Sequence, residues 1–275
     1  MRLSIDHRTS YRFSVPQLRL VQMLRLTPSD TDDQTIAAWR IDVDCDARLR
    51  EGRDGFGNRT TMLYVDGPIS AIEIAVSGEV LTGEIDGLVS GAPEPLPPVL
   101  FTRSTPATIA DEAITAFAEA ARGNEARAKL EAVADALHGR FALNHDRPEA
   151  GVTAAAAFAR PAATARDMAH MFVSAARVLG FPARYVSGHC LTCFAGSDRP
   201  TTHAWAEAHV EGTGWIGIDP CRGRAIDESY VRVAHGLDAA QAAPVAGSRL
   251  GMGREMLDVE VHVERLGADG GGGEA

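Results

Sequence analysis

The stretch that organises the chain reads Ala163-Thr-Ala-Arg-Asp-Met-Ala-His-Met-Phe-Val-Ser-Ala-Ala-Arg-Val-Leu-Gly180. Its apolar residues recur at steps of three and four, which predicts one buried face of a helix. Gly180, followed by Pro182, predicts the end of that helix. A helix start collects unpaired backbone N–H groups and partial positive charge, which suit a thiolate or an oxyanion. The residue expected to do chemistry therefore lies at this start, where the sequence has Ala165.

Two later stretches predict a pair of neighbouring strands. The first, His203-Ala-Trp-Ala-Glu-Ala-His-Val210, alternates polar and apolar residues as a half-buried strand does. The second, Gly214-Trp-Ile-Gly-Ile-Asp-Pro220, follows after the glycine-rich turn Glu211-Gly-Thr-Gly214. A short turn of this kind indicates that the two strands pair with each other.

Together these stretches resemble the core of the bacterial transglutaminase-like superfamily, a papain-like thiol enzyme fold. The family pattern is Cys-Gln/Arg-Asp-Phe-Ala-His, then Pro-Ala-Arg-Tyr-Val-Ser-Gly, then His-Ala-Trp-Ala-Glu, then Trp-x-x-x-Asp-Pro. This chain has four matching motifs in that order: Arg166-Asp-Met-Ala-His170, Pro182-Ala-Arg-Tyr-Val-Ser-Gly188, His203-Ala-Trp-Ala-Glu207 and Trp215-Ile-Gly-Ile-Asp-Pro220. The match fails at one position, because the nucleophilic cysteine of the family falls on Ala165.

The resemblance implies a role for each of the matching polar positions. In the family a thiolate attacks an amide carbonyl, a histidine shuttles the proton, and a carboxylate orients the histidine ring. These roles fall on Ala165 as the nucleophile position, on His203 and on Asp219. Tyr185 and Trp205 are assigned to substrate binding, Trp205 as a wall of the cleft and not as a catalytic group. The implied substrate is a peptide or protein amide, and no cofactor is implied.

The alanine at position 165 leaves three hypotheses open. The chain is a thiol enzyme whose cysteine has been replaced by engineering, a natural pseudoenzyme that binds a peptide or protein partner, or a purely structural scaffold. Retention of His203 and Asp219 favours the first, since lost catalysis would have eroded both. In an active form, water arriving at the acyl-enzyme gives hydrolysis and an amine gives transamidation. The resemblance favours amide hydrolysis.

A second constellation could hold zinc. Cys190 and Cys193 form a Cys-x-x-Cys pair, and His203, His209 and Cys221 follow it. A single pair without a second one is a weak signal, so we expect no metal. None of the three cysteines lies at a predicted helix start, so none is expected to replace the missing nucleophile. No EF-hand pattern indicates calcium.

The periodicity changes along the chain and predicts an α+β protein of two domains. Several short alternating strands predict an N-terminal β-sandwich domain over residues 1–100, which ends near the proline-rich connector Gly91–Pro98. A papain-like core, with helices packed on an antiparallel sheet, is expected over residues 101–267. The alternation of Asp258–Glu264 predicts a last strand of that core sheet, and the glycine-rich residues 268–275 predict a disordered tail.

Composition excludes some partners. The formal charge of −10 disfavours non-specific binding to nucleic acid or to an anionic membrane. Four cysteines in 275 residues are few for a disulfide framework, which fits a reducing compartment. The N-terminal residues enter a strand-like pattern directly, without the apolar region of a signal peptide. The sequence therefore predicts a cytoplasmic location.

Overall fold

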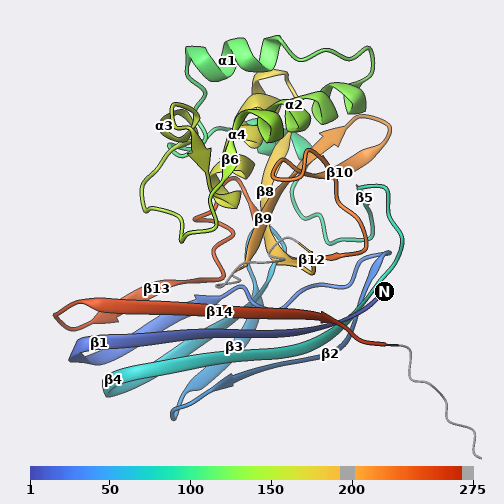
Figure 1. Cartoon of the computed structure of the whole chain (residues 1–275). Helices are drawn as coiled ribbons and strands as arrows, with labels where there is room; N and C mark the ends of the chain where they lie inside the picture. Colours follow the sequence, from blue (N-terminus) through green and yellow to red (C-terminus); the bar gives the residue numbers. More distant parts are fainter. Residues whose placement is uncertain (193–201, 268–275) are drawn as a thin grey trace, which may run out of the picture.

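A computed structural model describes residues 1–192 and 202–267 in two layers (Figure 1). One layer is a sheet of long strands, and the other is a smaller sheet with helices packed against it. The α+β class expected from the sequence is confirmed. The tail predicted to be disordered, residues 268–275, lies outside the described residues.

The N-terminal strands form one continuous sheet, where a sandwich would have two. β1 and β4 are long enough to pair with different strands at their two ends, so β14 and β2 extend the sheet at one end and β13 and β3 at the other. The β1–β4 register shifts between Arg12 and Arg19, where the ladder is irregular. The strands are β1 (Arg2–Leu24), β2 (Gln34–Val43), β3 (Arg48–Arg53), β4 (Arg59–Thr82), β13 (Val245–Leu250) and β14 (Glu255–Arg265).

The last two strands belong to this sheet and not to the core. β14 pairs antiparallel with β1, from Leu3 opposite Arg265 to Phe13 opposite Glu255. The prediction that Asp258–Glu264 completes the core sheet was therefore wrong. Alternation encodes which side of a strand is buried, and it carries no information about the sheet that the strand joins. The division of the chain at residue 100 stays a prediction.

The second sheet carries the two strands predicted from the turn at Glu211–Gly214. β9 and β10 pair antiparallel, with Val210 opposite Gly214 and Ala206 opposite Ile218, so this prediction is confirmed. The strand order is β11-β10-β9-β8-β12, and β5 pairs with β10. The strands are β5 (Leu88–Val89), β8 (Ala183–Cys190), β9 (His203–Val210), β10 (Gly214–Asp219), β11 (Arg224–Ala225) and β12 (Tyr230–Gly236).

Helix α4 packs against β8 and β9 and is the predicted helix that begins at Ala165. Thr164 is its N-cap, and Thr164 and Asp167 form a capping box, so backbone groups at the helix start have side-chain partners. Gly180 has a φ of 86°, the left-handed conformation that favours glycine at a helix end. The other elements here are η1 (Pro98–Thr102), α1 (Glu112–Glu119), α2 (Ala126–Arg140), β6 (Ala142–Leu143), α3 (Ala154–Phe158) and β7 (Ala162–Ala163), with α4 spanning Ala165–Val178.

The two layers are joined by paired hydrogen bonds from amide side chains of the N-terminal layer. Asn58 donates from Nδ2 to the His235 carbonyl at 2.8 Å, and its Oδ1 accepts from the His235 N–H at 2.9 Å. Gln34 satisfies both backbone groups of Arg232 in the same way, at 2.9 and 2.8 Å. Each side-chain amide thus bonds to one residue of β12 as the backbone of a neighbouring strand would. Among the described residues no helix is long and apolar enough to cross a membrane.

Candidate active site

The first element of the site is the start of α4. Ala165 is the first residue of the helix, so its backbone N–H has no partner within the helix. Its side chain is half-buried and packs against the cluster that contains Tyr185 and Ala204. Ala204 directly follows His203, so this packing brings the start of α4 next to the start of β9.

The second element is a buried histidine–carboxylate pair. His203 is the first residue of β9 and Asp219 is the last residue of β10. Because the two strands are antiparallel, the start of one lies beside the end of the other. Nε2 of His203 is 2.7 Å from Oδ2 of Asp219, and both side chains are almost fully buried. The structure therefore brings together two of the three residues that the sequence nominated.

Asp219 is fixed by two further hydrogen bonds. The Tyr230 hydroxyl donates to Oδ2 at 2.7 Å, and the Cys221 backbone N–H donates to Oδ1 at 2.9 Å. Burial alone would raise the pKa of Asp219, but attraction to His203 and these hydrogen bonds outweigh it and lower the pKa. An ionised Asp219 holds the proton of His203 on Nε2, which leaves Nδ1 as the basic nitrogen of the ring.

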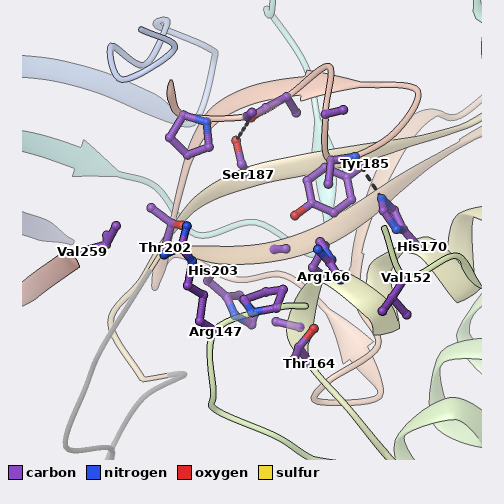
Figure 2. A pocket seen from close by; sticks show the side chains of 18 of the residues that line it. Arg147, Val152, Thr164, Arg166, His170, Tyr185, Ser187, Thr202, His203 and Val259 are labelled. Atoms are coloured by element: carbon purple, nitrogen blue, oxygen red, sulfur yellow. Dashed lines mark hydrogen bonds between the residues drawn. The ribbon is translucent and has the colours of Figure 1, made fainter. Parts of the chain in front are cut away.

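The site opens into a large cavity between the two layers. The cavity has a volume of about 1020 Å³ and is lined by Ala165 and His203 together with residues of both sheets (Figure 2). From the N-terminal layer His7, Thr9 and Tyr11 of β1 contribute to its wall. Ala165, at the position predicted for the nucleophile, and His203 thus line one cavity that can hold a substrate.

Comparison with known proteins agrees with this architecture. Residues 3–81 match the profile of the bacterial transglutaminase-like N-terminal region, and residues 113–220 match that of the transglutaminase-like superfamily. The chain belongs to the transglutaminase-like superfamily. Its relatives include uncharacterised proteins of Mycobacterium leprae and of Mycobacterium tuberculosis, each 26% identical. These alignments cover 96% and 90% of this chain, and 99% and 87% of the relatives.

A solved structure shares the fold of this chain. It is a protein of Cytophaga hutchinsonii described as a candidate cysteine protease, with a TM-score of 0.78 and 20% sequence identity. The alignment covers 98% of this chain and 92% of that chain, so both layers are shared.

The two aromatic residues assigned to substrate binding lie in different places. Tyr185 lines the cavity, with its ring 5.2 Å from that of His170. Trp205 is fully buried and lies outside the cavity wall, with its ring 6.3 Å from His203 and 5.4 Å from Tyr230. Its position supports packing beneath His203 and does not fit the predicted contact with substrate. Side chains alternate along a strand, so Trp205 shares the face of His203 but lies deeper.

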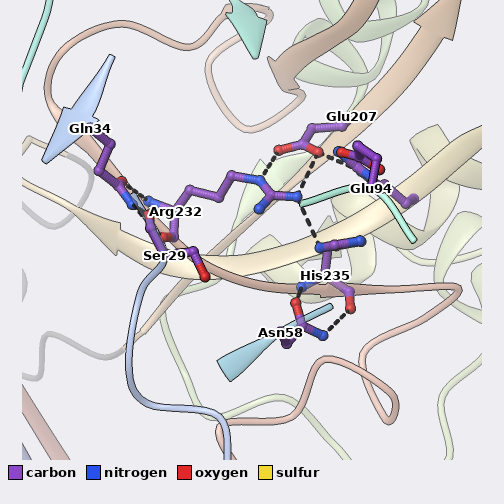
Figure 3. A network of polar contacts seen from close by, with 8 residues as sticks. Ser29, Gln34, Asn58, Glu94, Glu207, Arg232 and His235 are labelled. Carbon is purple, nitrogen blue, oxygen red and sulfur yellow. Dashed lines mark hydrogen bonds and ion pairs between the residues drawn. The ribbon is translucent and has the colours of Figure 1, made fainter. Parts of the chain in front are cut away.

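Two further motif residues of this transglutaminase-like chain form a buried ionic network. Glu207 accepts from Arg184 Nε at 2.6 Å and from Arg232 Nε at 2.6 Å, and Glu94 of the connector binds Arg184 (Figure 3). Glu207 and Arg184 are fully buried. Burial alone would raise the pKa of Glu207, but the two guanidinium groups outweigh it and lower the pKa to about 2. The network ties β8, β9, β12 and the connector together.

The described residues that could hold a metal ion differ from the set that the sequence indicated. Cys190 is disulfide-bonded, and His209 lies at the opposite end of β9 from His203. Cys193 lies outside the described residues. Cys221 does approach the site, since its Sγ and ligand atoms of His203 and Asp219 lie within 4.8 Å of one another. These are donor types that zinc accepts, but burial and the nearby Asp219 raise the pKa of the Cys221 thiol. A raised pKa disfavours the thiolate needed by a metal or by a substitute nucleophile.

A loop from β12 closes one side of the cavity. His170 accepts from the Ala239 N–H at Nε2 over 2.9 Å, and the Ser187 hydroxyl donates to the Ala242 carbonyl at 2.7 Å. Burial lowers the pKa of His170 to about 4, so its ring is neutral and able to accept. Tyr230 and this loop are site features that sequence reasoning missed, because no local pattern links them to the motifs.

Proposed function

We propose that this chain is a transglutaminase-like thiol amidase or peptidase that acts on a peptide or protein amide. Its nucleophile position is occupied by Ala165, so the form described is inactive. The observation that supports the proposal is the buried His203–Asp219 pair, preserved at 2.7 Å, beside the start of α4 and facing a large cavity. A scaffold would have no need for an ionised carboxylate aligned on a histidine at the wall of a cavity.

The proposed chemistry requires a cysteine at position 165. Its thiol proton moves to Nδ1 of His203, and the sulfur bonds to the carbonyl carbon of an amide. The backbone N–H of residue 165, at the positive end of α4, faces the resulting oxyanion. The C–N bond then breaks, and the amine leaves with the proton from His203. Water attacks the thioester, returns a proton through His203, and releases the acid and the thiol.

Asp219 acts through His203 in this scheme. It orients the ring, selects the tautomer with a basic Nδ1, and stabilises the imidazolium that forms after proton transfer. Asp219 keeps hydrogen bonds from Tyr230 and from the Cys221 backbone, so it does not itself take up the proton. Ala165 offers no nucleophile, and the protein as it stands is expected to bind an amide substrate without turning it over.

We favour a cysteine replaced by engineering over a natural pseudoenzyme. A Cys→Ala change is small, and it removes the reaction while leaving the helix start and the cavity unchanged in shape. The retained His203–Asp219 geometry supports this account. The codon for residue 165 in the natural gene decides between the two: a cysteine codon supports replacement, and an alanine codon supports the pseudoenzyme.

The decisive experiment is alkylation of the Ala165→Cys variant by iodoacetamide from pH 4 to pH 9, followed by mass spectrometry. We expect fast labelling of residue 165 well below pH 8.5, roughly the pKa of an unperturbed thiol. The double variant with His203→Ala should label slowly at the same pH. An ordinary thiol profile that does not depend on His203 would contradict the proposal and favour a binding or scaffold role.

A further inference from the structure

The outer edge of β14 forms part of the cavity wall. Leu257, Asp258 and Val259 line the same cavity as Ala165 and His203, and Figure 2 places Val259 on the side of Thr202 and His203. Within residues 1–192 and 202–267, β1 is the one strand that pairs with β14. The opposite edge of β14 therefore presents backbone groups that no described strand occupies.

Two hydrogen bonds determine which residues face that edge. The Ser14 N–H donates to the Arg254 carbonyl at 3.0 Å, and the Leu266 N–H donates to the Arg2 carbonyl at 2.9 Å. Both bonds involve even-numbered residues on each strand. Because bonded and non-bonded pairs alternate in an antiparallel ladder, the even residues of β14 bond to β1. The odd residues, among them Leu257 and Val259, direct their N–H and C=O groups outward.

Contact with a side chain confirms the outward direction. Arg147, another residue of the cavity wall, donates from Nη1 to the Leu257 carbonyl at 3.2 Å. The carbonyl is thus accessible from the cavity side and already accepts a hydrogen bond there. An exposed guanidinium occupies the position that the N–H of an added strand would take.

The side chains beside this edge suit an extended chain. Tyr11 lies opposite Leu257 and Thr9 lies opposite Val259, so these four side chains share one face of the sheet. That face turns toward the core, because its continuation, Ile5, packs against Val231 and Val233 of β12. A strand added to β14 would place alternate side chains over this mixed apolar and polar surface.

We propose that the outer edge of β14 binds an extended segment of a polypeptide substrate as an added strand and leads it to position 165. The inference rests on the proposed function for the class of substrate, an unfolded or locally extended polypeptide. Leu257 and Val259 together offer two N–H donors and the Val259 carbonyl as an acceptor, and the Leu257 carbonyl becomes available when the added strand displaces the exposed Arg147 guanidinium. The backbone provides affinity independent of sequence, and the cavity face provides selection of side chains. β14 belongs to the N-terminal sheet, so the substrate site includes both layers.

A proline pair tests the edge directly. Val259→Pro removes an outward N–H without removing a bond to β1, so an edge strand tolerates it. Val263→Pro is the matched control, because it has the same outward phase but lies about 13 Å further along the strand and outside the cavity wall. The probe is fluorescein-labelled β-casein, an unfolded polypeptide, titrated with the protein as it stands and followed by fluorescence anisotropy.

We expect saturable binding that Val259→Pro weakens at least tenfold and Val263→Pro leaves within twofold. Amide hydrogen exchange on the unsubstituted protein provides a second measurement, in which casein should protect the Leu257 and Val259 amides. Absence of saturable binding, equal affinity in the two variants, or unprotected amides would overturn the proposal. Iodoacetamide labelling of Ala165→Cys needs no peptide, so it tests the thiol chemistry separately: normal labelling with no casein binding rejects the edge alone.

Discussion

β9 holds two ionisable groups in contrasting surroundings: Glu207 near the middle of the strand, the sealed site, and His203 at its start, the open site. Glu207 is fully buried, is neutralised by two guanidinium groups, and is not among the residues that line the cavity next to Ala165. His203, four residues earlier, is equally buried in the sheet but lies at the wall of a cavity of about 1020 Å³. A charge whose partners surround it completely holds strands together. A group with a partner on one side and a cavity on the other is available for chemistry.

The largest expected loss of stability is at the sealed site, Glu207. Glu207→Gln leaves Arg184 and Arg232 buried without a carboxylate between them. Removing one partner of a buried ionic network costs about 3–5 kcal/mol of unfolding free energy. Urea unfolding measures the loss, and Asp42→Asn, which breaks an exposed pair with Arg40, is the control at well under ~1 kcal/mol. Equal losses in the two variants would remove the distinction between sealed and exposed charges.

A smaller effect on stability is expected from protonation of His235, which lies beside the sealed site. His235 accepts from Arg232 Nη2 at 2.9 Å, and burial with the charges of Arg184 and Arg232 lowers its pKa well below 6.5. The folded state therefore favours the neutral ring, and this stability is present above pH 6.5 and lost as the pH falls through the folded pKa. The loss is at most about 1.4 kcal/mol per pH unit for one proton.

Substitution at His235 isolates this contribution. Unfolding free energies of His235→Gln at pH 7.5 and pH 5 should differ less than those of the unsubstituted protein. His262→Gln, which removes an exposed ring of β14, is the matched control, and the reduction in pH dependence should be larger in His235→Gln than in this control. If His235→Gln has the same pH dependence as the parent, folding does not disfavour protonation of His235, and the surroundings of Glu207 and Arg232 are more accessible to water than we describe.

Tyr230 of β12 supports the open site, because it bonds to the carboxylate that pairs with His203. Tyr230→Phe deletes the hydroxyl that donates to Asp219, a hydrogen bond to a charged group that contributes about 1.5–3 kcal/mol. In the Ala165→Cys background the pKa of Asp219 should rise, and alkylation should be slower at the acid end of the profile. Tyr11→Phe, which removes a hydroxyl of the cavity wall on β1 of the other sheet, serves as the control. A merely structural Tyr230 would change stability and leave the shape of the pH profile unaltered.

Local sequence patterns predicted the structural features of the site that depend on residues close together in the chain. The period of Met168, Met171 and Phe172 predicted α4, and the short turn at Glu211–Gly214 predicted the pairing of β9 with β10. That pairing is what brings His203 to Asp219.

Contacts between distant residues could not be predicted in the same way. Tyr230 reaches Asp219, and Arg232 reaches Glu207, through the position of β12 beside β8, which no spacing in the sequence encodes. The same limit explains the wrong sheet for β14. A single strand alternates identically whether it extends one sheet or another, and the choice depends on which edge is exposed after the rest has folded.

A smaller effect on stability than at Glu207 is expected at the open site, His203. His203→Ala removes a side chain that borders the cavity, where water can replace it, and Asp219 keeps its bonds from Tyr230 and the Cys221 N–H. We expect a loss of unfolding free energy smaller than the about 3–5 kcal/mol of Glu207→Gln, because two of the hydrogen bonds to Asp219 remain and the cavity admits water to the space of the ring. A loss as large as that of Glu207→Gln would make His203 a structural residue like Glu207. His203 and Glu207 would then both serve to hold strands together, and the case for chemistry at position 165 would rest on the cavity alone.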